Sequence, residues 1–214
     1  MSDAASSSAA GRRIGSATSK TRAVIVESAE QLMVDEGHAS VTYRSVAGRA
    51  GVTAGLVQYY FPTIEDLFGA VLHNGTDRIL EEVDRAFQGD QPLHELWAYS
   101  SDPTGAALIV EFMAAANHRK EIWEKIGEGG ERVRRAWLEA LSERWQRYGI
   151  PESDLPPAAL LFMLTAIGRM ARLEEAFGTR TGHDEAIALV ERFLDSIEPS
   201  KPARPARAER RRKT

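Results

Sequence analysis

The sequence predicts an all-α protein of about nine helices, with a three-helix head at the N-terminal end and a larger helical body after it. Three observations support this prediction. Apolar residues recur with a period near 3.6 from Thr21 to Glu198, alternating strand patterns are absent, and Gly or Pro clusters separate the periodic segments. The chain has 214 residues, of which 43% are hydrophobic, so it can fill a sizeable core.

The head begins with a helix predicted from about Thr21 to Glu36, and Gly37 supplies the C-terminal stop. The apolar residues Ile25, Ala29, Leu32 and Met33 share one face of this helix. We expect that face to pack against the next two helices.

Residues 42–61 are predicted to form two short helices joined by a tight turn at Gly51. Thr42 and Thr53 can each cap a helix N-terminus through a side-chain oxygen. In the second helix Val57 and Phe61 recur at i and i+4 and face inward, which turns the intervening residues outward. A helix, a tight turn and a second helix suit reading the major groove of DNA.

The run from Ala50 to Thr63, AGVTAGLVQYYFPT, resembles the helix-turn-helix of TetR-family transcriptional regulators, A-G-V-[ST]-x-G-x-[LV]-x-x-Y-F followed by a polar capping residue. The resemblance implies that Thr42 and Tyr43 contact phosphates, that Arg44 reaches a base, and that the outer side of the second helix reads the groove. The implied DNA-binding set is Thr42, Tyr43, Arg44, Thr53, Ala54, Gly55, Gln58, Tyr59 and Tyr60. Repression is the family's usual mode.

Two positions depart from the commoner family pattern. Gln58 stands where Tyr is usual, and a bidentate amide there suits the edge of adenine. Ile64 stands where Lys is usual, which removes an ammonium that would contact a phosphate. We expect an adenine preference and low phosphate affinity.

A fourth helix is predicted from Thr63 to about Phe87, with one apolar stripe formed by Ile64, Leu67, Phe68, Val71, Leu72 and Ile79. A short helix follows near 93–100, and a further start signal lies at Asp102 and Pro103. Two more segments follow, 106–117 and one carrying Val133, Trp137, Leu141 and Trp145 at i+4 spacing. Because Gly127, Gly129 and Gly130 each weaken a helix by about 1 kcal/mol relative to Ala, we expect a bend or a local opening there.

The last two helices predict a dimer interface. Residues 158–167 are apolar on nearly all sides, and residues 184–197 carry one wide apolar stripe. A helix that is apolar all round needs cover on two sides, so two copies of these helices are expected to form a four-helix interface. A two-fold homodimer also places two recognition helices about 34 to 36 Å apart on a palindromic site in double-stranded DNA.

The body is rich in aromatic and sulfur-containing side chains, which can line a ligand cavity or fill a core. The resemblance favours a cavity, because the family's body typically encloses an effector pocket. The predicted walls are Trp97, Phe112, Met113, Trp137, Phe162 and Met163, with Asn117, His118 and Arg169 as polar anchors. This set suits a small, largely apolar effector.

Charge is distributed unevenly along the chain, whose formal net charge is −4. Residues 1–22 carry four basic and one acidic residue, residues 196–214 carry seven basic and two acidic, and the rest carries 16 basic and 28 acidic. We expect a flexible basic arm over 1–19, the DNA-binding domain over 20–63, the effector-binding and dimerisation domain over 64–198, and a disordered basic tail over 199–214. Arg12 and Arg13 could enter a minor groove or stay solvated.

The sequence indicates neither an enzyme, a metal site nor a cofactor. The five histidines lack metal-ligand spacing, and the nearest pair, Glu111 and His118, lies two helical turns apart. With no signal-peptide core and no membrane-length apolar run, we expect a cytoplasmic protein that does not contact membranes. Two alternatives remain open: an all-α enzyme or carrier for a hydrophobic small molecule, and a DNA-binding dimer without an effector.

Overall fold

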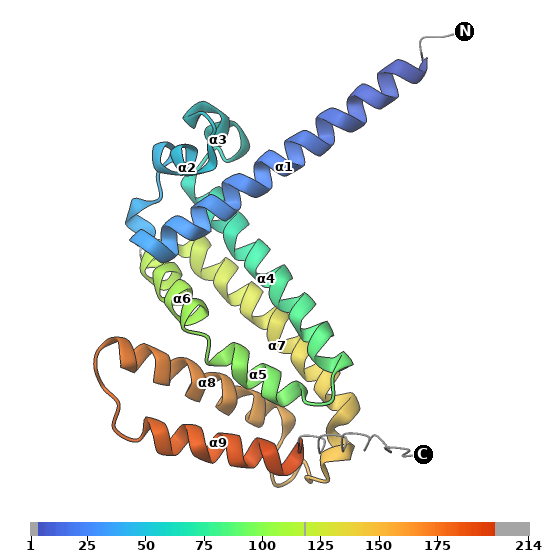
Figure 1. Ribbon diagram of the computed structural model, residues 1–214, viewed down its shortest axis with the longest axis vertical. Helices are drawn as coiled ribbons and strands as arrows, with labels where there is room; N and C mark the ends of the chain where they lie inside the picture. The colour runs from blue at the N-terminus through green and yellow to red at the C-terminus, as the bar shows by residue number, and fades with distance from the viewer. Residues whose placement is uncertain (1–3, 118, 200–214) are drawn as a thin grey trace, which may run out of the picture.

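The computed structural model describes the backbone of residues 4–117 and 119–199, and the side chains of this part from Lys20 onward. Within this part the fold is all helical, as predicted (Figure 1). The elements are α1 (Ala4–Glu36), the 3-10 helix η1 (His38–Ser40), α2 (Tyr43–Ala50), α3 (Ala54–Tyr60), α4 (Ile64–Gln88), α5 (Pro92–Ser100), α6 (Pro103–Ala116), α7 (Lys120–Tyr148), α8 (Pro157–Ala176) and α9 (His183–Ile197). The tail predicted over 199–214 lies outside the described residues from position 200 onward.

Helix α1 begins at Ala4, much earlier than the predicted start near Thr21. The predicted start is therefore wrong, and the backbone of the expected arm is helical from Ala4 onward. Alanine is the best helix former, and five alanines occur from Ala4 to Ala17, so a helix nucleated in the head can extend toward the N-terminus. The side chains of Arg12 and Arg13 lie outside the described residues.

The head packs as the apolar spacing predicts. Ile25, Ala29, Leu32 and Met33 on α1 are all buried, and so are Val46 and Ala47 on α2, Val57 on α3 and Phe61 directly after it. This cluster does not end at residue 63, because it continues through Leu67, Phe68 and Val71 of α4 to Phe112 of α6 and Ile122 of α7. The head and the adjoining part of the body therefore share one hydrophobic core.

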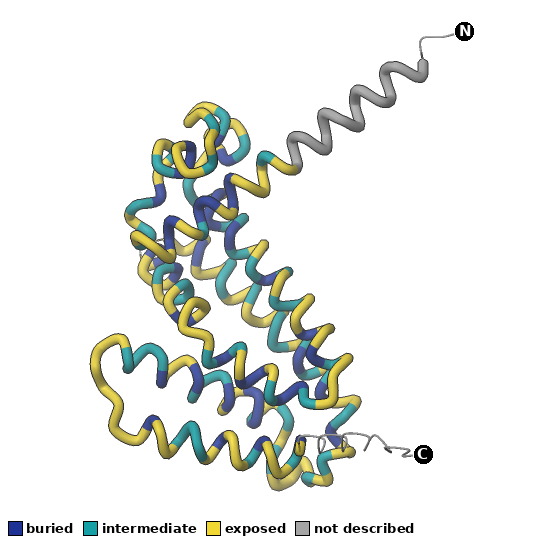
Figure 2. The backbone as a smooth tube through the Cα atoms, in the orientation of Figure 1, coloured by how far each residue is buried: buried dark blue, intermediate teal, exposed yellow. Residues whose placement is uncertain are grey.

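A second hydrophobic core lies at the other end of the molecule. It contains Val83 of α4, Trp97 of α5, Trp137 and Trp145 of α7, and Leu164 of α8, among others. The long helices α4 and α7 lie side by side, run in the same direction and connect the two cores (Figure 1). The burial pattern in Figure 2 follows the same arrangement, with buried segments at both ends of the α4 and α7 pair.

No local opening occurs at the three glycines, since α7 is one continuous helix from Lys120 to Tyr148. The structure gives one of these glycines another role. A Cβ atom at Gly129 would lie 2.8 Å from the hydroxyl oxygen of Thr76 on α4. Gly129 thus permits the close approach of α4 and α7, and the packing of the two helices supports α7 where its own propensity is weak.

Candidate nucleic-acid interface and ligand cavity

The second and third helices are each capped by the threonine that the sequence assigns to that role. The Thr42 hydroxyl accepts a hydrogen bond from the backbone N–H of Ser45 at 3.1 Å, and the Ser45 hydroxyl accepts one from the N–H of Thr42 at 2.9 Å. The Thr53 hydroxyl accepts a hydrogen bond from the Leu56 N–H at 3.3 Å. Between the helices Gly51 adopts φ of +67°, a left-handed conformation that glycine adopts without strain. The turn and both helix starts are therefore fixed locally.

Burial of Val57 and Phe61 fixes the rotation of α3. With that side against the core, Ala54, Gly55, Gln58 and Tyr59 are exposed, and Tyr59 keeps 76% of its surface accessible. Figure 1 places α2 and α3 at the end of the molecule opposite α8 and α9. A short helix held in this way can enter a groove about 12 Å wide.

Seven of the nine residues in the predicted DNA-binding set are exposed, namely Thr42, Arg44, Thr53, Ala54, Gly55, Gln58 and Tyr59. Tyr43 and Tyr60 are half-buried. The Tyr43 hydroxyl donates a hydrogen bond to the Pro62 carbonyl at 2.8 Å, which ties the start of α2 to the loop after α3. Since a phosphate can only accept hydrogen bonds, Tyr43 must give up this bond before its hydroxyl can bind one.

The charge of the head surface suits a polyanion. No acidic residue occurs from Gly37 to Ile64, and Arg44 is exposed with no carboxylate of the described residues within ion-pair distance. Arg49, by contrast, pairs with Asp35 at 2.6 Å and Glu36 at 3.0 Å at the end of α1. Arg49 thus positions α2, whereas Arg44 is available to a partner.

A cavity of about 730 Å³ lies in the body, where α4, α6, α7 and α8 meet. Its wall includes Val71 and Phe112 of the first core and Trp137 and Leu161 of the second, so the cavity lies at the boundary between them. This volume is typical of sites for small molecules, and it far exceeds the voids of a packed core.

Four of the nine predicted pocket residues line this cavity: Phe112, Met113, Trp137 and Arg169. Trp97 is buried in the second core instead, and Asn117 is exposed just beyond the end of α6. Phe162 and Met163 are exposed on α8, outside the wall. His118 lies outside the described residues.

Sequence analysis missed several wall residues, among them Glu30, Arg78, Tyr99, Trp123 and Arg134. For α7 a signal exists in the spacing, since Trp123, Ile126, Gly130, Val133 and Trp137 follow one face and all line the cavity. For α8 the composition carries no such signal, because apolar residues occupy nearly every side of its first half.

Most ion pairs among the described residues join two side chains, and a larger group joins His94 to Asp195 and to Glu198, each at 3.2 Å. Within the described residues no group of three His, Asp or Glu side chains could hold a metal ion. The carboxylate of Glu111 is paired with the ring of His38 in η1 at 2.8 Å. None of the helices described has both the length and the low polarity needed to cross a lipid bilayer.

Comparison with known proteins agrees with this geometry. Residues 25–71 match a sequence model described as "Bacterial regulatory proteins, tetR family". The HTH-type transcriptional regulator HbdR of Aromatoleum sp. (strain CIB) is 26% identical over 118 residues, which are 52% of each chain. The chain thus spans about half the length of this curated relative.

Solved structures share the fold over most of the chain. A transcriptional regulator from Rhodococcus sp. Rha1 is 21% identical with a TM-score of 0.59, covering 85% of this chain and 99% of that one. A TetR transcription regulator from Haloarcula marismortui is 17% identical with a TM-score of 0.65, covering 84% and 98%. Residues 25–71 thus resemble the TetR family of bacterial regulatory proteins, and most of the chain shares its fold with these solved structures.

Proposed function

We propose that this protein is a sequence-specific DNA-binding transcriptional regulator, a repressor released by a small, largely apolar effector. The observation that carries this proposal is the exposed outer side of α3, which lies inside the segment that matches the family. Residues 20–63 would then read DNA, and residues 64–198 would bind the effector and form the dimer.

In the proposed complex α3 enters the major groove. Gln58 and Tyr59 project from its outer side and can reach base edges, while Ala54 and Gly55 let the helix start approach closely. The caps of α2 and α3 each occupy one backbone N–H of the first turn, and the remaining first-turn N–H groups suit phosphates. Arg44 adds a positive charge on the same side of the head.

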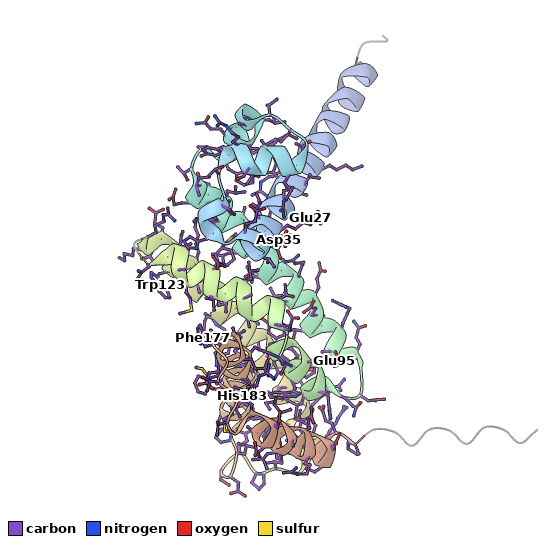
Figure 3. The ribbon with its side chains drawn as sticks, turned by 60° about the vertical axis from the view of Figure 1, so that its left-hand side comes forward. Glu27, Asp35, Glu95, Trp123, Phe177 and His183 are labelled. Atoms are coloured by element: carbon purple, nitrogen blue, oxygen red, sulfur yellow. The ribbon has the colours of Figure 1, made fainter. Side chains whose placement is uncertain are left out.

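A homodimer formed by α8 and α9 is part of the proposal. Met163, Met170 and Phe177 recur at seven-residue intervals and are all exposed, with 75% of Phe177 accessible (Figure 3). Leu189 of α9 is also exposed. An apolar stripe of this kind is typical of an interface between helices of two subunits.

The cavity supports an effector-responsive repressor over a DNA-binding dimer without an effector. It touches α4, whose residues Val71, Thr76 and Ile79 lie in its wall and whose N-terminus follows α3 directly. An effector that prefers a conformation with a displaced α4 would misplace the two heads relative to successive major grooves. To change the population from 99:1 to 1:99, that preference must be about 5.5 kcal/mol.

The proposal is tested with DNA from upstream of the protein's own gene. Fluorescence anisotropy should show salt-dependent binding, and footprinting should show two inverted half-sites one helical turn apart. A footprint without two-fold symmetry would contradict the dimer. Absence of salt-dependent binding to any duplex would contradict the function itself.

A further inference from the structure

The carboxylates in the cavity wall already have partners within the protein. Glu30 pairs with Arg78, and Glu82 lies 3.8 Å from Arg85. Asp102 accepts a hydrogen bond from the Gly105 N–H at 2.6 Å, as the cap of α6. Glu82 and Asp102 thus have their charge met within the protein, whereas Oε2 of Glu30 is buried with no hydrogen-bond partner among the described residues and offers one unused acceptor.

Two arginines in the same wall, unlike the carboxylates, have no ion-pair partner among the described residues. Arg134 of α7 and Arg169 of α8 have no carboxylate oxygen within 4.0 Å in the part of the chain that is described. Each guanidinium instead lies over an aromatic ring, Arg134 at 5.6 Å from the centroid of Phe162 and Arg169 at 5.9 Å from that of Tyr99. A ring positions a guanidinium but does not neutralise its charge.

Protein groups use few of the N–H donors of these arginines, of which Arg134 is half-buried and Arg169 is exposed. The nitrogen Nη2 of Arg169 reaches the Tyr99 hydroxyl only at 3.4 Å, and Arg134 makes no hydrogen bond to another described residue. A guanidinium carries five N–H donors in a planar arrangement that matches a carboxylate. The α8 side of the cavity thus offers positive charge and free donors together.

A third donor without a partner belongs to the same wall. Trp137 follows Arg134 by about one helical turn on α7, and its indole nitrogen is buried with no hydrogen-bond acceptor among the described residues. Buried donors are normally satisfied, so an unsatisfied one in a cavity wall indicates a missing acceptor.

We infer that the ligand of this cavity is an organic carboxylate with an apolar body, whose carboxylate binds on the α8 side at Arg134 and Arg169. The inference rests on the proposed function, whose effector site it makes more specific. The aromatic and aliphatic walls, among them Ile109, Phe112 and Trp137, bind the body, and the arginines select the charge. The unpaired guanidiniums thus decide which apolar molecules bind.

The test uses three probes that share one alkyl chain, namely dodecanoate, dodecanol and dodecylammonium. Isothermal titration calorimetry on the full-length protein should show dodecanoate binding at least tenfold more tightly than dodecanol, with dodecylammonium weakest. Arg134→Gln and Arg169→Gln should each reduce dodecanoate affinity about tenfold and leave dodecanol affinity within about twofold. Arg135→Gln is the matched control, because Arg135 is exposed, pairs with Glu131 at 3.3 Å and does not line the cavity.

Several outcomes would overturn the inference: equal affinity for the three probes, tightest binding of dodecylammonium, no binding of any probe, or a carboxylate preference that survives in the double variant. DNA binding is measured separately on the same preparations. Loss of probe discrimination with intact binding to upstream DNA overturns the ligand class alone. Arginine-dependent dodecanoate binding without any DNA binding preserves the ligand class and contradicts the proposed regulator.

Discussion

Glu111 on α6 and His38 in η1 are joined by two hydrogen bonds to one carboxylate oxygen. The Oε2 atom of Glu111 accepts from the His38 backbone N–H at 2.7 Å and lies 2.8 Å from Nδ1 of the same residue. His38 immediately precedes the helix-turn-helix, whereas Phe112 and Met113, next to Glu111, line the cavity. This pair therefore links the wall of the cavity to the head without passing through α4.

Replacing Glu111 with Ala should weaken communication between cavity and DNA. We expect the DNA affinity of the ligand-free protein to change by less than about threefold, and the release of DNA by ligand to decrease. Loss of hydrogen bonds to a half-exposed charged group should also lower the free energy of unfolding by about 1–2 kcal/mol. Anisotropy titrations with and without ligand, together with urea unfolding, measure both. His73→Ala is the control, since His73 pairs with Asp77 on the surface of α4.

The same pair predicts a pH dependence. The backbone hydrogen bond from His38 lowers the pKa of Glu111 below its ordinary value of 4.5. A carboxyl whose pKa is lower in the folded state stabilises the fold above its unfolded pKa, and this contribution is lost as the pH falls through the folded pKa. The difference in unfolding free energy between wild type and Glu111→Gln should therefore be constant well above that ordinary value and shrink below it. A difference that grows on acidification would contradict this assignment.

Gly129 and Gly130 provide a matched pair for testing the contact between α4 and α7. Gly129→Ala would place a methyl group 2.8 Å from the Thr76 hydroxyl, so we expect a loss of about 1–3 kcal/mol of stability. A Cβ at Gly130 meets no atom within 4 Å, and Gly130→Ala should stabilise the protein by about 0.5–1 kcal/mol. Chemical denaturation measures the unfolding free energy of both variants. Equal changes in the two would show that the close approach of α4 and α7 does not require a glycine at position 129.

Gln58 should discriminate bases rather than attract phosphates. We expect Gln58→Ala to weaken binding to the specific site by about 1–3 kcal/mol and to leave binding to unrelated duplexes unchanged. Gln146→Ala, at an exposed position near the end of α7, should alter neither. Anisotropy at matched salt gives the ratio of the two affinities. A uniform loss on all sequences would assign Gln58 to the phosphates.

The exposed stripe on α8 should control assembly. Met170→Glu places a charge in the proposed dimer interface and should raise the dimer dissociation constant more than about tenfold, as measured by analytical ultracentrifugation. Val110→Glu introduces the same charge at an exposed position of α6 and should leave assembly unchanged. Dimers that persist in Met170→Glu would place the interface elsewhere.

Much of the fold follows from local signals in the sequence. Thr42, Thr53 and Thr63 each cap the helix that the sequence assigns to them, because a cap depends only on residues within one turn. The extent of α1 beyond the head is not predictable in this way, because its alanines favour a helix while the serines and Gly11 among them weaken it. The local opening that the α7 glycines predict is wrong, because α7 stays helical through Gly129 where it packs against Thr76, a residue distant in sequence.

The candidate sites can be predicted where the apolar pattern of one helix determines which of its faces is exposed. The outer side of α3 follows from Val57 and Phe61, which alone fix its rotation. The cavity wall is harder to predict, because α8 is apolar on several sides and nothing local indicates that Phe162 faces outward. The pairing of Glu111 with His38 joins residues 73 positions apart, and no local spacing encodes it.

The cavity lies between two hydrophobic cores that the long helices α4 and α7 connect. Atoms on either side of such a space lack the close contacts that make a protein interior stiff, so the molecule deforms there more easily than within either core. The head belongs to the first core, whereas α8 and α9 lie at the opposite end of the molecule. A ligand in the cavity can therefore change the angle between the two ends of the molecule. Because α3 lies far from the cavity, a small change of this angle gives a larger displacement of α3 at the DNA.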